Sequence, residues 1–179
     1  MNQEDLRVRR TQNDIQLGFI KMLQHKPFSN ITINDICTAG MVGRSTFYHH
    51  YPDKYALLDA LVTQEAAKFD QLLATRMVGI QQDQLLINLY QGLAQDADRI
   101  TTLLDVHTRS VDLNQRYLAS LKDHLDHLWP QISLDVPREF ILDFYAHSAL
   151  MAISWALKHG HEDQIATFMN QMTKNVLNG

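Results

Sequence analysis

The sequence predicts an all-α protein of about nine helices, and three observations lead to this fold class. Apolar residues recur at spacings of three and four through most of the 179 residues, which is the period of one helix face. Glycine and proline, which interrupt helices, occur only seven and four times. Alternation of β-branched and polar residues, which marks a half-buried strand, is scarce.

Three helices are predicted in the first third of the chain. The first ends before Lys26, because a residue before proline is pushed out of the helical backbone region. The second begins at Thr32, which has Asp35 at the spacing of a capping box. A short turn of sequence GMVG precedes the third, which Pro52 ends. The predicted ranges are 5–25, 32–39 and 44–51.

Six more helices are predicted after Pro52. The first of them is long and carries large apolar residues at helical spacing until Gly79. A later helix has Asp112 as its N-cap and places Leu113, Leu121 and Leu125 on one face. The predicted ranges are 53–77, 83–96, 98–108, 112–129, 137–159 and 162–178.

Charge is distributed unevenly along the chain. Residues 1–58 hold seven Lys/Arg and five Asp/Glu, whereas residues 59–179 hold nine and fifteen. A mildly basic head on an acidic body is compatible with a small DNA-binding domain joined to a second domain. No apolar run approaches the roughly 18–20 residues of a membrane helix, and the N-terminus lacks the apolar region of a secretory signal. With Cys37 as the single cysteine, we expect a cytoplasmic protein without membrane contact or disulfides.

The third helix has a distinctive division of side chains. If Phe47 and Tyr51 face the core, Ser45 and His49 lie on the opposite side, since successive residues turn by about 100°. Hydroxyl, imidazole and guanidinium groups suit base edges and phosphates. Two short helices joined by a few residues have the form of a helix-turn-helix, whose second helix enters the major groove. The outward face is predicted to consist of Arg44, Ser45, Thr46, Tyr48 and His49.

The stretch ITINDICTAGMVGRSTFYHHYPDKYALLDAL resembles the DNA-binding domain of TetR/AcrR-type transcriptional regulators. The resemblance covers about residues 8–62, and the run from GRSTFY to DKYALLD is also similar to the branch that includes dihydroxyacetone kinase operon regulators. The family pattern T-x-Y-x-H-aromatic-x-D/N/S-K-x-x-L is matched by Thr46, Tyr48, His50, Tyr51, Asp53, Lys54 and Leu57.

The resemblance implies a three-helix DNA-binding domain over residues 1–53 and a helical effector-binding and dimerisation domain over residues 54–179. It implies a homodimer that binds a double-stranded operator, a repressor released by an effector. An alternative is a co-regulator whose second domain docks a partner protein instead of a small ligand. By the resemblance, the outward face of the third helix reads DNA, and Thr32, His50 and Lys54 hold phosphates.

Two residues depart from the family pattern in the turn before the recognition helix. The family has glycine where this chain has Met41, and a capping serine where it has Gly43. Glycine is a weaker N-cap than serine by only a few tenths of a kcal/mol. The departure concerns the geometry of the turn and leaves the motif in place.

Side chains of the second domain fit an effector pocket or a plain core, and single residues of this kind are more often core. The predicted pocket consists of Phe69, Tyr90, Leu104, His107, Tyr117 and Trp129.

The last two predicted helices fit dimerisation, because a row of small residues lets another helix approach closely and two helices from each subunit make a four-helix bundle. Alternatively, the apolar residues of both helices close the core of the monomer. The predicted interface consists of Ser148, Ala152, Trp155, Ala156, Phe168 and Met172.

An enzyme is not predicted, because the sequence has no nucleophile–base signature, no glycine-rich phosphate loop and no set of metal ligands. His124 and His127 lie near acidic residues at helical spacing, but the leucines of that helix place this row on its solvated face. No metal or other cofactor is expected.

Overall fold

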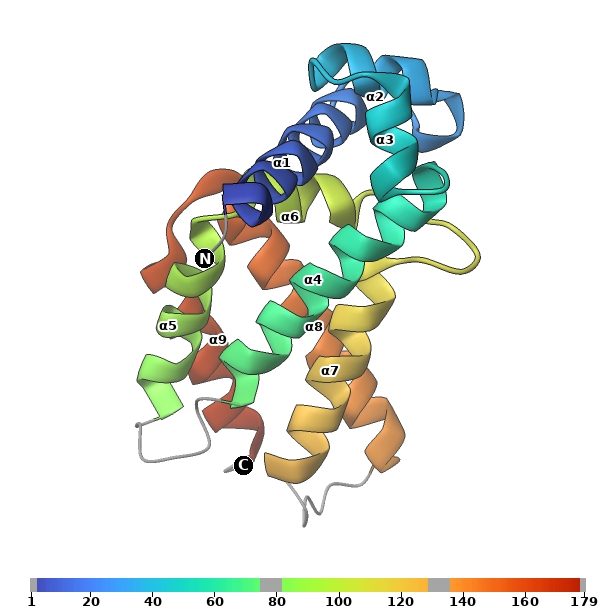
Figure 1. Ribbon diagram of the computed structural model, residues 1–179. Helices are drawn as coiled ribbons and strands as arrows, with labels where there is room; N and C mark the ends of the chain where they lie inside the picture. The colour runs from blue at the N-terminus through green and yellow to red at the C-terminus, as the bar shows by residue number, and fades with distance from the viewer. Residues whose placement is uncertain (1–2, 75–81, 129–135, 178–179) are drawn as a thin grey trace. The chain divides into compact units, whose positions relative to one another are not determined.

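The computed structural model of the protein describes residues 3–74, 82–128 and 136–177. These residues form nine α helices and no strand, which confirms the predicted fold class. Figure 1 shows them in chain order. The helices are α1 (Gln3–Leu23), α2 (Ile33–Ala39), α3 (Arg44–His50), α4 (Lys54–Ala74), α5 (Gln82–Ala94), α6 (Ala97–Leu104), α7 (Leu113–Leu128), α8 (Arg138–His159) and α9 (Glu162–Leu177), with a short 3-10 helix, η1 (Phe28–Asn30), between α1 and α2.

Contacts within the chain define two compact units. The first consists of Met1–Gln64 and Thr102–Leu113, and the second of Glu65–Thr101 and Asn114–Gly179. Helix α4 belongs to both units, because the division falls at its centre. The boundary predicted after residue 53 separates a DNA-binding domain from an effector-binding and dimerisation domain. It concerns function and remains a prediction.

The first unit is built around a close crossing of α1 and α2. A Cβ atom on Gly18 would lie 2.5 Å from the backbone nitrogen of Gly40, and one on Gly40 would lie 2.6 Å from the carbonyl oxygen of Asp14. Only residues without a side chain permit this approach. The fully buried apolar residues of this unit include Ile15, Phe19, Ile31, Ile36, Phe47, Leu57, Leu58 and Leu61.

Helix α6 is shorter than its predicted range 98–108, and a loop takes the place of its last residues. The Thr108 hydroxyl donates to the Val111 carbonyl at 2.6 Å and accepts from the Val111 N–H at 2.9 Å. His107 and Asp112 form an isolated antiparallel bridge. These local side-chain bonds offer the backbone an alternative to the helix.

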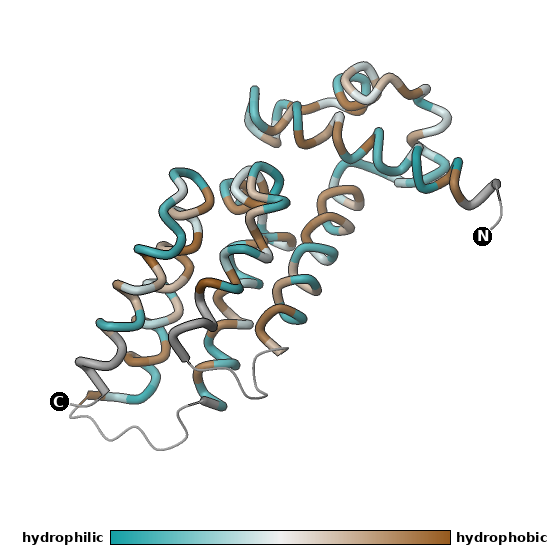
Figure 2. Tube along the Cα trace, turned by 90° about the vertical axis from the view of Figure 1, so that its left-hand side faces the viewer, coloured by the Kyte–Doolittle hydropathy of each residue, from teal (hydrophilic) through white to brown (hydrophobic). Residues whose placement is uncertain are grey.

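In the second unit, α5 contacts α8 and α9, and α8 contacts α9. Figure 2 shows hydrophobic and hydrophilic residues alternating along the helices, as amphipathic packing requires. Glu65, only 1% exposed, accepts hydrogen bonds from Arg99 at 3.1 Å and Lys68 at 3.3 Å. Lys68 also bonds to Asp96 at 3.0 Å. A carboxylate buried so deeply needs such partners, and sequence periodicity did not indicate them.

Candidate nucleic-acid interface

Helices α2 and α3 form a helix-turn-helix whose turn keeps a glycine-like backbone. Met41 has φ 53°, in the left-handed region that glycine enters at no cost. The turn is closed by bonds from the Gly40 N–H to the Ile36 carbonyl at 2.8 Å and from the Val42 N–H to the Cys37 carbonyl at 2.9 Å. Methionine therefore adopts the conformation that the resemblance assigns to glycine, with a side chain that is 93% exposed.

The orientation predicted for α3 is confirmed by burial. Phe47 is fully buried and Tyr51 is 7% exposed. The Tyr51 hydroxyl accepts a hydrogen bond from Gln16 Nε2 of α1 at 3.2 Å. Burial and this bond set the rotation of α3 about its own axis. Arg44, Ser45, Tyr48 and His49 are exposed, and Thr46 is half-buried.

His49 and His50 lie side by side at the end of α3. Their ring centroids are 5.5 Å apart in an edge-to-face arrangement. Burial lowers the pKa of His50, and the neighbouring charge of His49 lowers it further. The half-buried His50 ring therefore favours the neutral form, which has one donor and one acceptor nitrogen.

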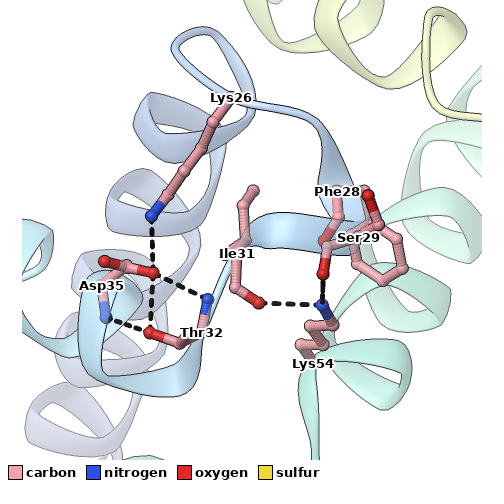
Figure 3. A network of polar contacts seen from close by, with 7 residues as sticks. All are labelled: Lys26, Phe28, Ser29, Ile31, Thr32, Asp35 and Lys54. Carbon is pink, nitrogen blue, oxygen red and sulfur yellow. Dashed lines mark hydrogen bonds and ion pairs between the residues drawn. The ribbon is translucent and has the colours of Figure 1, made fainter.

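Lys54, predicted to hold a phosphate, has another set of partners (Figure 3). Its Nζ donates to the carbonyl oxygens of Phe28 at 2.9 Å, Ser29 at 3.0 Å and Ile31 at 2.8 Å. An ammonium group has three protons, so a phosphate contact requires that at least one of these bonds be given up. Burial lowers the pKa of Lys54, because it disfavours the charged ammonium group. The three carbonyl oxygens favour that charged form and so act against the effect of burial.

The Lys54 ammonium also lies near two aromatic rings. Its Nζ is 4.7 Å from the ring centroid of Phe28 and 5.8 Å from that of Tyr55. Both distances fall within the range of cation–π attraction. Lys54 thus fastens the start of α4 to η1 and to the residue before the α2 cap.

Thr32 and Asp35 form the predicted capping box at the start of α2. The Asp35 carboxylate accepts from the Thr32 N–H at 2.8 Å and from the Thr32 hydroxyl at 2.6 Å. Lys26 contacts the same carboxylate at 2.7 Å. The bonds from Lys26 and Thr32 hold the pKa of Asp35 well below its usual range. The Thr32 hydroxyl proton, which the resemblance assigns to a phosphate, is therefore used within the chain.

The residues predicted to line one effector pocket are divided between the two units. Phe69 and Tyr117 stack at 3.9 Å in the second unit, and Tyr90 is fully buried there. Leu104 is buried in the first unit, and the His107 side chain is 63% exposed on its loop. Trp129 lies outside the described residues.

The predicted dimer face needs correction at two positions. Ala152 and Ala156 are 5% and 0% exposed, so the small-residue row packs inside its own chain. Trp155 and Phe168 are 40% and 60% exposed, while Ser148 and Met172 are half-buried. Three other exposed apolar residues of α8 lie in one row with Trp155 at helical spacing: Phe140, Phe144 and Met151.

A helix-turn-helix with an exposed polar second helix is the arrangement of a DNA-binding domain. A family model described as bacterial regulatory proteins, tetR family, matches residues 20–61. An uncharacterized HTH-type transcriptional regulator, YxbF of Bacillus subtilis (strain 168), is 37% identical over 67 residues. That match covers 37% of this chain and 18% of YxbF, so it spans less than a fifth of that relative.

Similarity to solved structures extends over nearly the whole chain. A TetR transcriptional regulator from Streptococcus agalactiae 2603V is 25% identical, with a TM-score of 0.69, covering 94% of this chain and 96% of that one. The dihydroxyacetone kinase operon activator DhaS has the same coverage with a TM-score of 0.59, and its 14% identity shows a shared fold alone. Residues 20–61 thus match the DNA-binding domain of the tetR family, and the fold of the chain is that of TetR-type transcriptional regulators.

Proposed function

We propose that the protein acts as a homodimer that represses transcription at an operator and is released by an effector. One observation carries the proposal: α3 is anchored through Phe47 and Tyr51 and leaves Arg44, Ser45 and Tyr48 exposed. These side chains supply donors and acceptors suited to the edges of bases. Thr46 and His49 complete the reading face.

Phosphate contacts are proposed for Thr32, His50 and Lys54. His50 is half-buried, and the N–H of its imidazole ring could donate a hydrogen bond to a phosphate oxygen. Thr32 and Lys54 already donate to groups of their own chain, so their phosphate roles require an exchange of partners on binding.

A second copy of the chain is the proposed occupant of the apolar row on α8, together with Phe168 of α9. Dimeric regulators place two reading helices on half-sites separated by whole turns of DNA, about 34–36 Å each. Helix α8 is also long and apolar enough to cross a membrane, by length and composition only. Its buried face and its exposed row are both apolar, which accounts for that composition, and we propose that the protein is cytoplasmic.

The effector is proposed to bind in the second unit near Tyr90 and Tyr117. Among the described residues, both hydroxyls are buried without a hydrogen-bond partner. Burial raises the pKa of each phenol, so both remain neutral donors. A buried polar group without a partner is costly, and a ligand with a polar atom would relieve that cost. The alternative remains a partner protein docked on the second domain, which predicts no small ligand at these hydroxyls.

Selection of binding sites from a random DNA pool, followed by titration of the selected site, tests DNA reading. Tyr48→Ala is expected to weaken binding to the selected site about tenfold or more. Leu17→Ala is the matched control, because Tyr48 and Leu17 are 49% and 54% exposed in the same unit and only Tyr48 lies on α3. Failure to select any preferred sequence would contradict the proposal.

A further inference from the structure

The first unit contains a groove that the DNA-reading role does not use. It has a volume of about 640 Å³, within the range of about 300–1,000 Å³ typical of small-molecule sites. One wall is formed by the end of α1, by Pro27 to Ser29 and by Tyr55 of α4. The other lining residues are Thr102 of α6 and the loop from Asp105 to Ser110.

Two aromatic rings contribute apolar surface to the first wall. Phe28 and Tyr55 pack edge to face with centroids 5.0 Å apart. The Lys54 ammonium lies 4.7 Å from the Phe28 ring, and its three carbonyl bonds hold the wall in place. Tyr55 remains 51% exposed, so its ring is available for stacking or edge-to-face packing against a ligand.

The charges of the groove leave one cation without an acidic partner. Lys26 contacts Asp35, and His107 Nδ1 contacts Asp112 at 2.8 Å. Asp105 also has a partner within the chain. Arg109 is exposed on the rim of the groove, and no ion pair involves it among the described residues. An exposed guanidinium without an ion pair is suited to bind a carboxylate through two parallel hydrogen bonds.

We infer that this groove binds a small organic carboxylate with an aromatic or flat apolar body. The body lies against Phe28 and Tyr55, and the carboxylate meets Arg109. The site belongs to the DNA-binding unit and is separate in composition from the tyrosine hydroxyls of the second unit.

The test uses 6-fluoro-2-naphthoate as probe and the uncharged 6-fluoro-2-naphthamide as its counterpart, with ¹⁹F NMR titration of the full chain and no DNA present. The naphthoate is expected to bind at least tenfold more tightly than the amide, because only the acid pairs with Arg109. Arg109→Gln should remove that preference by lowering naphthoate affinity to that of the amide. Tyr55→Ala should weaken both probes, about threefold or more.

Matched variants lie elsewhere in the same unit. Arg44→Gln and Tyr48→Ala remove an exposed arginine and an exposed tyrosine from α3 and are expected to leave the affinity for both probes within twofold of the unaltered chain. In a ¹⁵N-labelled chain, the naphthoate should shift the amide signals of Ser29, Tyr55 and Ser110.

Equal affinity for acid and amide, or unchanged affinity in Arg109→Gln, would overturn the inference. Shifts confined to signals near Tyr90 and Tyr117 would overturn it as well, since they place the probe in the second unit. No DNA is present in this experiment, so a negative result would not contradict the proposed DNA reading. A negative result in the DNA titration would likewise not contradict ligand binding in the groove.

Discussion

The ammonium nitrogen of Lys54 lies 2.8 Å from the carbonyl oxygen of Ile31, the residue before the α2 cap. Together with the bonds to Phe28 and Ser29, this contact ties the first residue of α4 to the segment that leads into the helix-turn-helix. Lys54 is therefore placed to transmit a movement of α4 to the reading head, whether or not it also meets a phosphate.

Replacing Lys54 separates these two roles. Lys54→Met keeps the length of the stem and removes three charge-assisted hydrogen bonds, so we expect the free energy of unfolding to fall by about 2 kcal/mol. The salt dependence of operator binding should remain unchanged if the ammonium stays on its carbonyls. Urea unfolding and DNA titration at several salt concentrations measure the two quantities. A salt slope lowered by about 1 with unaltered stability would instead identify a phosphate contact.

The capping box at the start of α2 makes the stability of the protein depend on pH in the acidic range. The pKa of Asp35 is lowered in the folded chain by Lys26 and Thr32, whereas an unfolded aspartate titrates near about 3.9. A lowered folded-state pKa contributes stability that is present above the unfolded value and is lost as the pH falls toward the folded value. The stability difference between the unaltered chain and Asp35→Asn should therefore be constant above about pH 5 and shrink below about pH 4.

Urea unfolding of both proteins between pH 3 and pH 7 measures this difference. A difference that stays the same across the whole range would show that the Asp35 carboxylate contributes no charge-dependent stability.

Met41 tests the cost of a side chain in a left-handed turn. Its φ of 53° carries a steric cost for residues with a Cβ atom, and its exposed side chain gains little from packing. Met41→Gly is expected to raise the free energy of unfolding by about 1 kcal/mol, after the entropy that glycine adds to the unfolded chain. His161, with φ 67°, is the matched position in the second unit, and His161→Gly should act in the same direction. Thermal unfolding measures both, and a loss of stability in Met41→Gly would contradict the assignment of strain.

The apolar row of α8 predicts the behaviour of the chain in solution. Met151→Glu places a charge in the middle of that row, and burying an unpaired charge in an interface is costly, so light scattering after gel filtration should show a monomer where the unaltered chain shows a dimer. Met41→Glu is the matched control, because Met41 is also an exposed methionine and lies outside the row. A monomeric unaltered chain would refute the homodimer, and binding of that chain to lipid vesicles would assign the row to a membrane surface.

Local pattern was sufficient to predict the fold class and the division of α3 into a buried and an exposed face. Periodicity places Phe47 and Tyr51 four residues apart on one side of α3, and both are buried. The Thr32–Asp35 capping box was also predicted, because its spacing lies within a single turn. A helix face and a cap depend on residues within about four positions, and their spacing is visible in the sequence itself.

Two features were decided by tertiary packing alone. The partners of Lys54 precede it by 23 to 26 residues, and no local spacing indicates them. Ala152 and Ala156 have the pattern of a contact face, yet the fold turns that side of α8 inward. A third difference is local: His107 lies on a loop of the first unit, where the predicted range 98–108 placed it in a helix, because the bonds between Thr108 and Val111 compete with the last turn of α6. Periodicity shows that a helix has distinct faces, whereas the neighbour that covers each face is selected by contacts between residues far apart in the chain.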